Sequence, residues 1–242
     1  MSRGPRVAVI VFPGTWSDRD FAHAATILGW EARLVWHTET ELPDPDAVVL
    51  PGGFAHGDHL RTGAIARFSP AMQAVEAFAA AGGPVLGSCN GFQILTEAGM
   101  LPGALLRNDH LEFRCDWQAL RVERGAGPWL GELRDGDTIR LPISHGEGRY
   151  FADEAVLDEL ERSGRVVLRY ADAAGMLPDA ANPNGSLRSI AGIVNARGNV
   201  LGLMPHPERA MEADLGGDDG LRLLRSLDAW LAAQPAGAER RL

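Results

Sequence analysis

The feature that most restricts the fold is a continuous run of apolar residues near the N-terminus, from Val7 to Phe12. Most of these residues are β-branched, and an uninterrupted apolar run is typical of a strand covered on both faces, as in a parallel sheet. A second such run, Ala47–Leu50, follows an expected helix that ends near Leu28 and an expected strand at 32–35. Both runs are followed by proline and glycine, which end a strand. The pattern predicts an α/β fold with buried parallel strands.

The composition is typical of one globular domain with a substantial core. The chain has 242 residues, of which 45% are hydrophobic and 23% are charged. We expect a single domain over residues 1–242, because the chain shows no internal repeat and no linker. A C-terminal helix and a tail, loose from Gln234 onward, occupy the end of this domain.

Charge and cysteine usage restrict the partners and the compartment. The net charge of −9 argues against nucleic acid or a membrane surface as the main partner, since both attract clustered Lys and Arg. Two cysteines, Cys89 and Cys115, form neither a disulfide framework nor a paired metal-ligand pattern. The apolar stretch before Pro13 is too short for a signal peptide or a membrane span. We therefore expect a cytoplasmic protein.

The stretch Val85–Gln93 reads as a strand that turns sharply into a helix. Gly87, Cys89 and Gly91 form the pattern Gly-x-Cys-x-Gly, related to the Gly-x-Ser-x-Gly elbow of serine hydrolases. A thiol at a helix N-terminus ionises more readily, because the unpaired N–H groups there carry partial positive charge. Taken alone, the pattern is equally compatible with a buried cysteine beside a glycine turn, so companion residues must decide.

His206 and Glu208 are the companions that cysteine hydrolysis requires, because an imidazole held by a carboxylate can move protons to and from a thiol. Pro205 and Pro207 are expected to hold this segment extended. Residues two apart in an extended chain project to the same side, so both side chains can face one target. We therefore hypothesise a triad of Cys89, His206 and Glu208.

A tetrahedral intermediate carries negative charge, so a catalytic cysteine also needs an oxyanion hole. The backbone N–H groups of Gly53 and Asn90 are the candidates, since Gly53 follows a buried strand and Asn90 follows the cysteine. The alternative for Gly53 is an ordinary tight turn.

The long segment Phe54–Ser69 shows no clean period and is expected to be a functional surface loop. It contains His56, Asp58 and His59, which we interpret as a solvated loop rather than a metal site, and we expect no metal. His145 lies between glycines and is a candidate substrate-pocket residue. No Walker-type loop is present, so we expect no ATP site made by this chain alone.

The alternation over Leu111–Trp117 predicts a half-buried strand with Cys115 on its apolar face, which favours a structural role for that thiol. The other expected elements are helices at 71–81, 154–161 and 221–232, strands at 138–143 and 165–170, and a hairpin of strands 190–194 and 200–204.

Three motifs together resemble the class I, triad-type glutamine amidotransferases: the elbow Gly87–Gln93, the upstream Pro51–Gly53 and the downstream His206–Glu208. Within that family, the loop Phe54–Pro70 and the segment His145–Arg149 are most similar to glutaminase subunits of purine biosynthesis. The resemblance runs from about residue 7 to about 212, leaving the helix and tail of 213–242.

The resemblance implies a flavodoxin-like α/β fold, with a mostly parallel twisted sheet, helices on both faces and an antiparallel extension. It also implies Cys89 as nucleophile, His206 as proton shuttle, Glu208 as its orienter and Gln93 as a contact to bound glutamine. The implied partner is a large synthetase, and the resemblance leaves open whether a small third subunit takes part. ATP and Mg²⁺ act at the synthetase, where the released ammonia is consumed, so this chain is expected to need no cofactor of its own.

The chain departs from the family pattern at Thr15–Ser17, His56 and His59. We expect these departures to affect loops and partner contacts rather than the triad. Two other functions remain open from the residues: a free-standing cysteine amidase or peptidase, and a non-catalytic subunit that keeps the fold.

Overall fold

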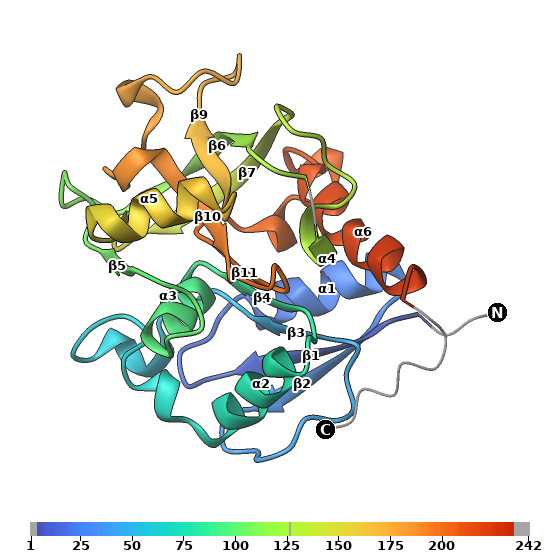
Figure 1. Cartoon of the computed structure of the whole chain (residues 1–242). Helices are drawn as coiled ribbons and strands as arrows, with labels where there is room; N and C mark the ends of the chain where they lie inside the picture. Colours follow the sequence, from blue (N-terminus) through green and yellow to red (C-terminus); the bar gives the residue numbers. More distant parts are fainter. Residues whose placement is uncertain (1–3, 126, 235–242) are drawn as a thin grey trace.

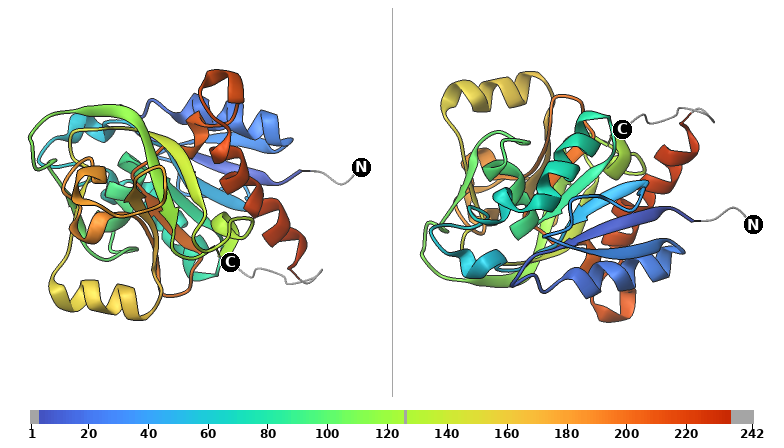
Figure 2. Two further views of the ribbon diagram at one scale, coloured as in Figure 1. Left: turned by 90° about the horizontal axis from the view of Figure 1, so that it is seen from above. Right: turned by 90° about the horizontal axis from the view of Figure 1, so that it is seen from below.

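The computed structural model describes residues 4–125 and 127–234, and it contains a large mixed sheet with helices on both faces (Figures 1 and 2). The strands are β1 (Arg6–Val11), β2 (Glu31–Trp36), β3 (Ala47–Leu50), β4 (Val85–Ser88), β5 (Ala104–Leu106), β6 (Arg114–Val122), β7 (Thr138–His145), β8 (Arg149–Phe151), β9 (Val166–Ala171), β10 (Ile190–Val194) and β11 (Val200–Leu203). The α-helices are α1 (Asp18–Leu28), α2 (Pro70–Ala80), α3 (Asn90–Glu97), α4 (Gly127–Leu130), α5 (Glu154–Arg162) and α6 (Asp219–Ala232).

The described residues form a nine-stranded sheet in the order β2-β1-β3-β4-β11-β10-β9-β6-β7, and β5 pairs with β8 separately. In this order, the strands from β2 to β11 are each parallel to their neighbours. The pairs from β11–β10 to β6–β7 are antiparallel. This architecture confirms the predicted α/β class, with its parallel sheet and antiparallel extension.

The parallel half is buried on both faces because its strands alternate between two apolar cores. In β1, Ala8 and Ile10 pack into the core that includes α2 and α3, whereas Val7 and Val9 pack into the core that includes α1 and α6. A strand with a core on each side requires an apolar residue at every position. This is why the run Val7–Phe12 predicted the strand correctly.

The antiparallel half corrects one prediction. Strand β6 begins at Arg114 rather than Leu111, and Cys115 is exposed, so its predicted position on an apolar face is wrong. The first three residues of β6 are all exposed, although two of their partners on β7, Ile143 and His145, are buried. Strand β9 pairs with β6 further along, at Ala119–Val122. Alternating polarity gives the two faces of a strand but not the point at which its neighbours begin to cover it.

The segment Phe54–Ser69 is a loop with two short 3₁₀ turns, η1 (Ala55–Asp58) and η2 (Ala66–Phe68). It packs close to the first turns of α3, where a Cβ on Gly63 would come within 2.9 Å of the Gln93 backbone. The predicted loose tail falls mainly on residues 235–242, which lie outside the described residues. No helix in the described ranges is long and apolar enough to cross a membrane.

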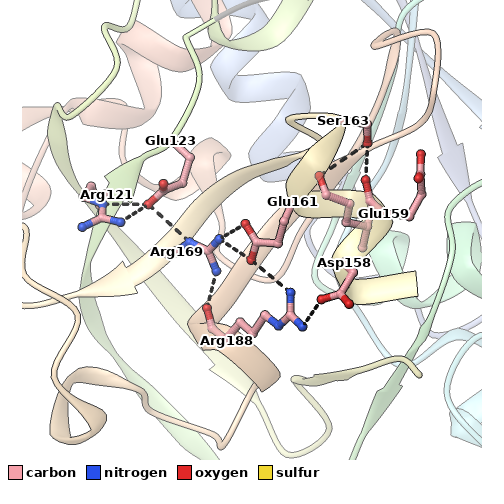
Figure 3. A network of polar contacts seen from close by, with 9 residues as sticks. Arg121, Glu123, Asp158, Glu159, Glu161, Ser163, Arg169 and Arg188 are labelled. Carbon is pink, nitrogen blue, oxygen red and sulfur yellow. Dashed lines mark hydrogen bonds and ion pairs between the residues drawn. The ribbon is translucent and has the colours of Figure 1, made fainter. Parts of the chain in front are cut away.

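A network of ion pairs joins the antiparallel strands to α5 (Figure 3). Arg169 on β9 is almost fully buried and lies 2.6 Å from Glu161 on α5 and 3.4 Å from Glu123. Its guanidinium also donates to the backbone carbonyl of Arg188. Arg188 in turn pairs with Asp158 at 2.6 Å. Residues remote in sequence thus fix α5 against the sheet.

Candidate active site

Cys89 lies at a sharp elbow between β4 and α3, at the carboxyl end of the parallel strands. Its backbone angles, φ 52° and ψ −109°, are unfavourable for a residue with a side chain. The flanking glycines are sterically required: a Cβ on Gly91 would collide with the Leu50 carbonyl, and one on Gly87 would lie 2.7 Å from the Gly91 carbonyl oxygen. The elbow predicted from the sequence is therefore present, and the strain is concentrated at the thiol.

The thiol of Cys89 is buried and faces β7 across the carboxyl end of the sheet. Its Sγ is 3.6 Å from the carbonyl oxygen of Ser144, and its backbone N–H donates to Leu203 O at 2.8 Å. The cysteine immediately precedes α3, whose first N–H groups point toward it. These features place the sulfur between the N-terminus of α3 and the carboxyl end of β7.

His206 and Glu208 follow β11 and are both buried. Nδ1 of His206 is 2.6 Å from a Glu208 carboxylate oxygen. The prediction that the two prolines hold this segment extended is wrong, because Pro207–Arg209 form a 3₁₀ turn. Pro207 occupies the first position of that turn, where its missing N–H costs nothing, and the turn brings the carboxylate back onto the imidazole. The prediction of an adjacent pair is confirmed, although the backbone that achieves it is different.

Ser88 was not predicted as a site residue, but its side chain contacts both Glu208 and His206. Its hydroxyl lies 3.1 Å from Oε2 of Glu208, 3.3 Å from the Pro205 carbonyl oxygen and 3.4 Å from Nδ1 of His206. The serine is fully buried. A hydroxyl beside Cys89 therefore links the elbow directly to the carboxylate that orients the histidine.

The electrostatics of the buried cluster favour a charged imidazole. Burial lowers the pKa of His206, but the negative charges of Glu208 and of the Cys89 sulfur outweigh it, so the net pKa is raised above its ordinary value. Nε2 of His206 is buried and has no hydrogen-bond partner among the described residues. Since Nδ1 is occupied by Glu208, Nε2 is the nitrogen left for proton exchange.

Trp16 corrects the expectation that the departures at Thr15–Ser17 leave the triad untouched. Its ring packs against the His206 imidazole with centroids 5.6 Å apart, and the Arg209 guanidinium lies 4.5 Å from the Trp16 ring. The hydroxyl of Ser17 accepts a hydrogen bond from Gly52 N–H at 2.8 Å. This loop therefore forms one wall around the histidine.

The two predicted oxyanion donors come from different segments near Cys89. Gly53 lines the same cavity as the cysteine, and a Cβ there would lie 2.7 Å from Gly14 O. Asn90 opens α3 directly after the cysteine. Within the described part of the chain, neither backbone N–H donates to another protein group. Both are thus available to a ligand.

The cavity at Cys89 has a volume of about 150 Å³. Gln93 and His145, both predicted to touch substrate, line it. The Gln93 amide is also used by the protein, because it accepts from Asn90 Nδ2 at 2.8 Å and donates to Glu147 O at 2.6 Å. The other lining residues are Gly53, Phe54, Asp58, Thr62, Phe113, Ser144, Gly146 and Glu147.

His145 is held in a buried polar network rather than aimed freely at the cavity. Its Nδ1 lies 3.2 Å from Asn108 Oδ1, and Nε2 lies 3.5 Å from Asn184 Nδ2. Burial lowers the pKa of His145 to about 3, with a further contribution from His206, so the ring is neutral. It contributes shape and hydrogen bonding to the cavity, without charge.

Asp58 and Glu147 also line the cavity, although neither was predicted from the sequence to contact substrate. Asp58 was interpreted as part of a solvated loop, yet its side chain is half-buried in the cavity wall. The described residues contain no group of three or more potential metal ligands. His56 and Asp58 both have positive φ angles, which the local sequence does not predict. The position of Asp58 in the cavity wall therefore had no sequence signal.

The comparisons with known proteins agree on one family. Residues 4–215 match the CobB/CobQ-like glutamine amidotransferase domain. Phosphoribosylformylglycinamidine synthase subunit PurQ of Thermomicrobium roseum is 57% identical over 92% of this chain and 94% of its own length. The chain belongs to the glutamine amidotransferase family. Among its members, PurQ of Gloeobacter violaceus is also 57% identical, over 93% of this chain and 97% of its own length.

Solved structures of this amidotransferase family show the same fold. A chain in the structure of PurLQS from Thermotoga maritima superposes with a TM-score of 0.84 and 41% identity, covering 94% of this chain and 99% of that one. Another glutamine amidotransferase from Thermotoga maritima superposes with a TM-score of 0.56 at 17% identity. This second match covers 95% of this chain and 92% of that one, and it shows the shared fold alone.

Proposed function

We propose that this chain is the glutamine-hydrolysing subunit of a phosphoribosylformylglycinamidine synthase. The observation that carries the proposal is the fully buried His206–Glu208 pair, 2.6 Å apart, whose imidazole also interacts with the Cys89 sulfur. The high identity to PurQ proteins over nearly the whole chain supports this particular synthase.

In the proposed reaction, the Cys89 thiolate attacks the side-chain amide carbon of glutamine. The negative charge moves to the amide oxygen, where the N–H groups of Gly53 and Asn90 stabilise it. His206 passes a proton to the amide nitrogen, so ammonia leaves and a thioester to Cys89 remains.

The second half of the reaction restores the enzyme. His206 takes a proton from water as the water attacks the thioester carbonyl. The carbon–sulfur bond then breaks, and glutamate and the Cys89 thiolate are released. Glu208 keeps Nδ1 of the imidazole occupied throughout, so proton transfer runs through Nε2.

We further propose that ammonia passes to a PurL-type synthetase, where ATP and Mg²⁺ act on formylglycinamide ribonucleotide, and that a PurS-type small subunit completes the complex. The likeness to a chain of the Thermotoga maritima PurLQS structure supports this assembly. Bound glutamine is the substrate of this chain, which needs no metal or cofactor for the hydrolysis proposed here.

The test is to copurify the chain with its synthetase and to compare glutamine with ammonium as nitrogen source. Cys89→Ala is expected to abolish glutamine-dependent synthesis and to leave ammonium-dependent synthesis intact. Full glutamine-dependent activity in Cys89→Ala would contradict the proposal. Robust hydrolysis of unrelated amides without any partner would favour a free-standing amidase instead.

A further inference from the structure

Two carboxylates stand in the wall of the Cys89 cavity, on segments far apart in sequence. Asp58 ends the turn η1, and Glu147 lies between β7 and β8. Glu147 has a cation near it, since Arg107 Nε is 3.5 Å from its carboxylate, but that arginine is 76% exposed. The wall of this cavity thus holds both the nucleophile and two acidic side chains.

The half-buried Asp58 carboxylate has one oxygen atom that lacks a protein partner among the described residues. Its Oδ1 atom is buried and has no hydrogen-bond partner among the described residues. Burial, with a smaller contribution from Glu147, raises the pKa of Asp58 to about 6. A buried acceptor without a donor is costly to the folded protein, so its persistence points to a cationic or hydrogen-bonding ligand.

The backbone holds Asp58 in this position at a conformational cost. Asp58 has φ 52°, and its neighbours His56 and Leu60 have φ 55° and 71°. Such left-handed angles are unfavourable for residues with side chains and persist when surrounding contacts impose them.

A chain of hydrogen bonds supplies those contacts and ties both acidic segments to α3. Ala55 N–H donates to Asn90 Oδ1 at 3.0 Å, and Asn90 Nδ2 donates to Gln93 Oε1 at 2.8 Å. Gln93 Nε2 then donates to Glu147 O at 2.6 Å. The turn that carries Asp58 and the turn that carries Glu147 are thus held on the helix that begins at the nucleophile.

We infer that Asp58, assisted by Glu147, binds the α-ammonium group of the amino-acid substrate and so restricts the site to α-amino acid amides. This inference rests on the proposed glutamine hydrolysis and specifies which end of glutamine the acidic wall recognises. Free glutamine carries a cationic ammonium group several bonds from its reactive amide. A carboxylate with an unfilled acceptor position satisfies that cation and leaves the amide to reach Cys89.

The experiment compares two substrates in the assembled complex. Glutamine and 4-carbamoylbutanoate have the same amide chain and carboxylate, but the second lacks the α-ammonium group. Asp58→Asn is expected to reduce kcat/KM for glutamine by about 10- to 100-fold, the loss typical of a charged hydrogen bond, and to leave the analogue nearly unchanged. The ratio of the two kcat/KM values should therefore fall by the same factor.

Glu147→Gln should lower this ratio by a smaller factor and serves as a second variant if Asp58→Asn folds poorly. Asp214→Asn changes an exposed aspartate outside the cavity and should leave the ratio unchanged. Equal losses for both substrates, or no loss for either, in the folded cavity variants would overturn the inference. Absence of glutamine hydrolysis by the unmodified complex would instead overturn the proposed function.

Discussion

The active site and the Arg169 network both bury ionisable groups in the mixed sheet, but they satisfy them differently. In the network, Arg169 meets Glu161, Glu123 and a backbone carbonyl within hydrogen-bond or ion-pair distance (Figure 3). In the active site, His206 Nε2 and Asp58 Oδ1 are buried and have no hydrogen-bond partner within the described part of the chain. The difference separates two uses of buried charge. The network fixes elements to one another, whereas the active site leaves polar atoms without a protein partner, and the proposed reaction and the inferred ammonium contact use them.

The largest expected effect is on catalysis, from Glu208→Gln. The amide keeps the shape of the carboxylate, but it cannot raise the pKa of His206 or hold one tautomer in the same way. We expect glutamine-dependent kcat to fall about 10³- to 10⁴-fold, as for loss of the acid in other triads. Steady-state kinetics with glutamine measure this loss.

The matched control for this substitution is Glu132→Gln, which changes an exposed glutamate outside the cavity and should leave kcat unchanged. A loss of less than about tenfold in Glu208→Gln would mean that the close His206–Glu208 contact is structural rather than catalytic.

The next effect is on stability, from Arg169→Met. This change leaves Glu161 and Glu123 without their buried cation, and we expect unfolding free energy to fall by about 2 kcal/mol, since both partners are partly solvated. Denaturant unfolding measures the change. The folded variant should keep its kcat, because the network has no part in the proposed reaction.

Arg222→Met is the comparison for the network. Arg222 pairs with Asp137 at 2.9 Å on the surface, and its loss should cost about 0.5 kcal/mol or less. Equal destabilisation by the two arginine substitutions would remove the distinction between the buried network and an ordinary surface pair.

The comparison also predicts a pH effect on substrate binding. Only ionised Asp58 attracts an ammonium group, and its pKa is raised to about 6, so KM for glutamine should rise about tenfold for each unit that pH falls below about 6. Of the other groups lining the cavity, His145 stays neutral, and Glu147 and Cys89 are the remaining titratable groups. In Asp58→Asn, KM should be high at every pH and nearly flat over this range; an unchanged pH profile would contradict the role given to Asp58.

The smallest effect is expected from Ser88→Ala. Loss of the hydroxyl 3.1 Å from Glu208 should loosen the carboxylate and lower kcat by about fivefold, near the value of one neutral hydrogen bond. Ser88→Thr should restore most of this activity; failure of Thr to rescue would indicate a packing role.

The sequence predicted most accurately those features that depend on neighbouring residues. A strand between two apolar cores must be apolar throughout, so the run Val7–Phe12 was recognisable, as was the glycine-flanked elbow at Cys89. The pairing of His206 with Glu208 was also correct, although it uses a 3₁₀ turn instead of an extended segment.

Features that depend on contacts between distant segments were not predictable. Cys115 is exposed because it precedes the part of β6 that pairs with β9, at Ala119–Val122, and strand periodicity does not show where a neighbouring strand begins. Asp58 enters the cavity because a relay through Asn90 and Gln93 fixes its strained turn. The contact of Trp16 with His206 likewise joins two loops that are remote in sequence.

The central claim is that Cys89 is a nucleophile that forms a covalent adduct at a glutamine-shaped site. Its most direct test is to treat the complex with a glutamine analogue that alkylates thiols and to locate the label by peptide mass spectrometry. We predict stoichiometric label on Cys89, none on the exposed Cys115, and protection by excess glutamine. An unlabelled Cys89, or labelling that glutamine does not prevent, would contradict the account.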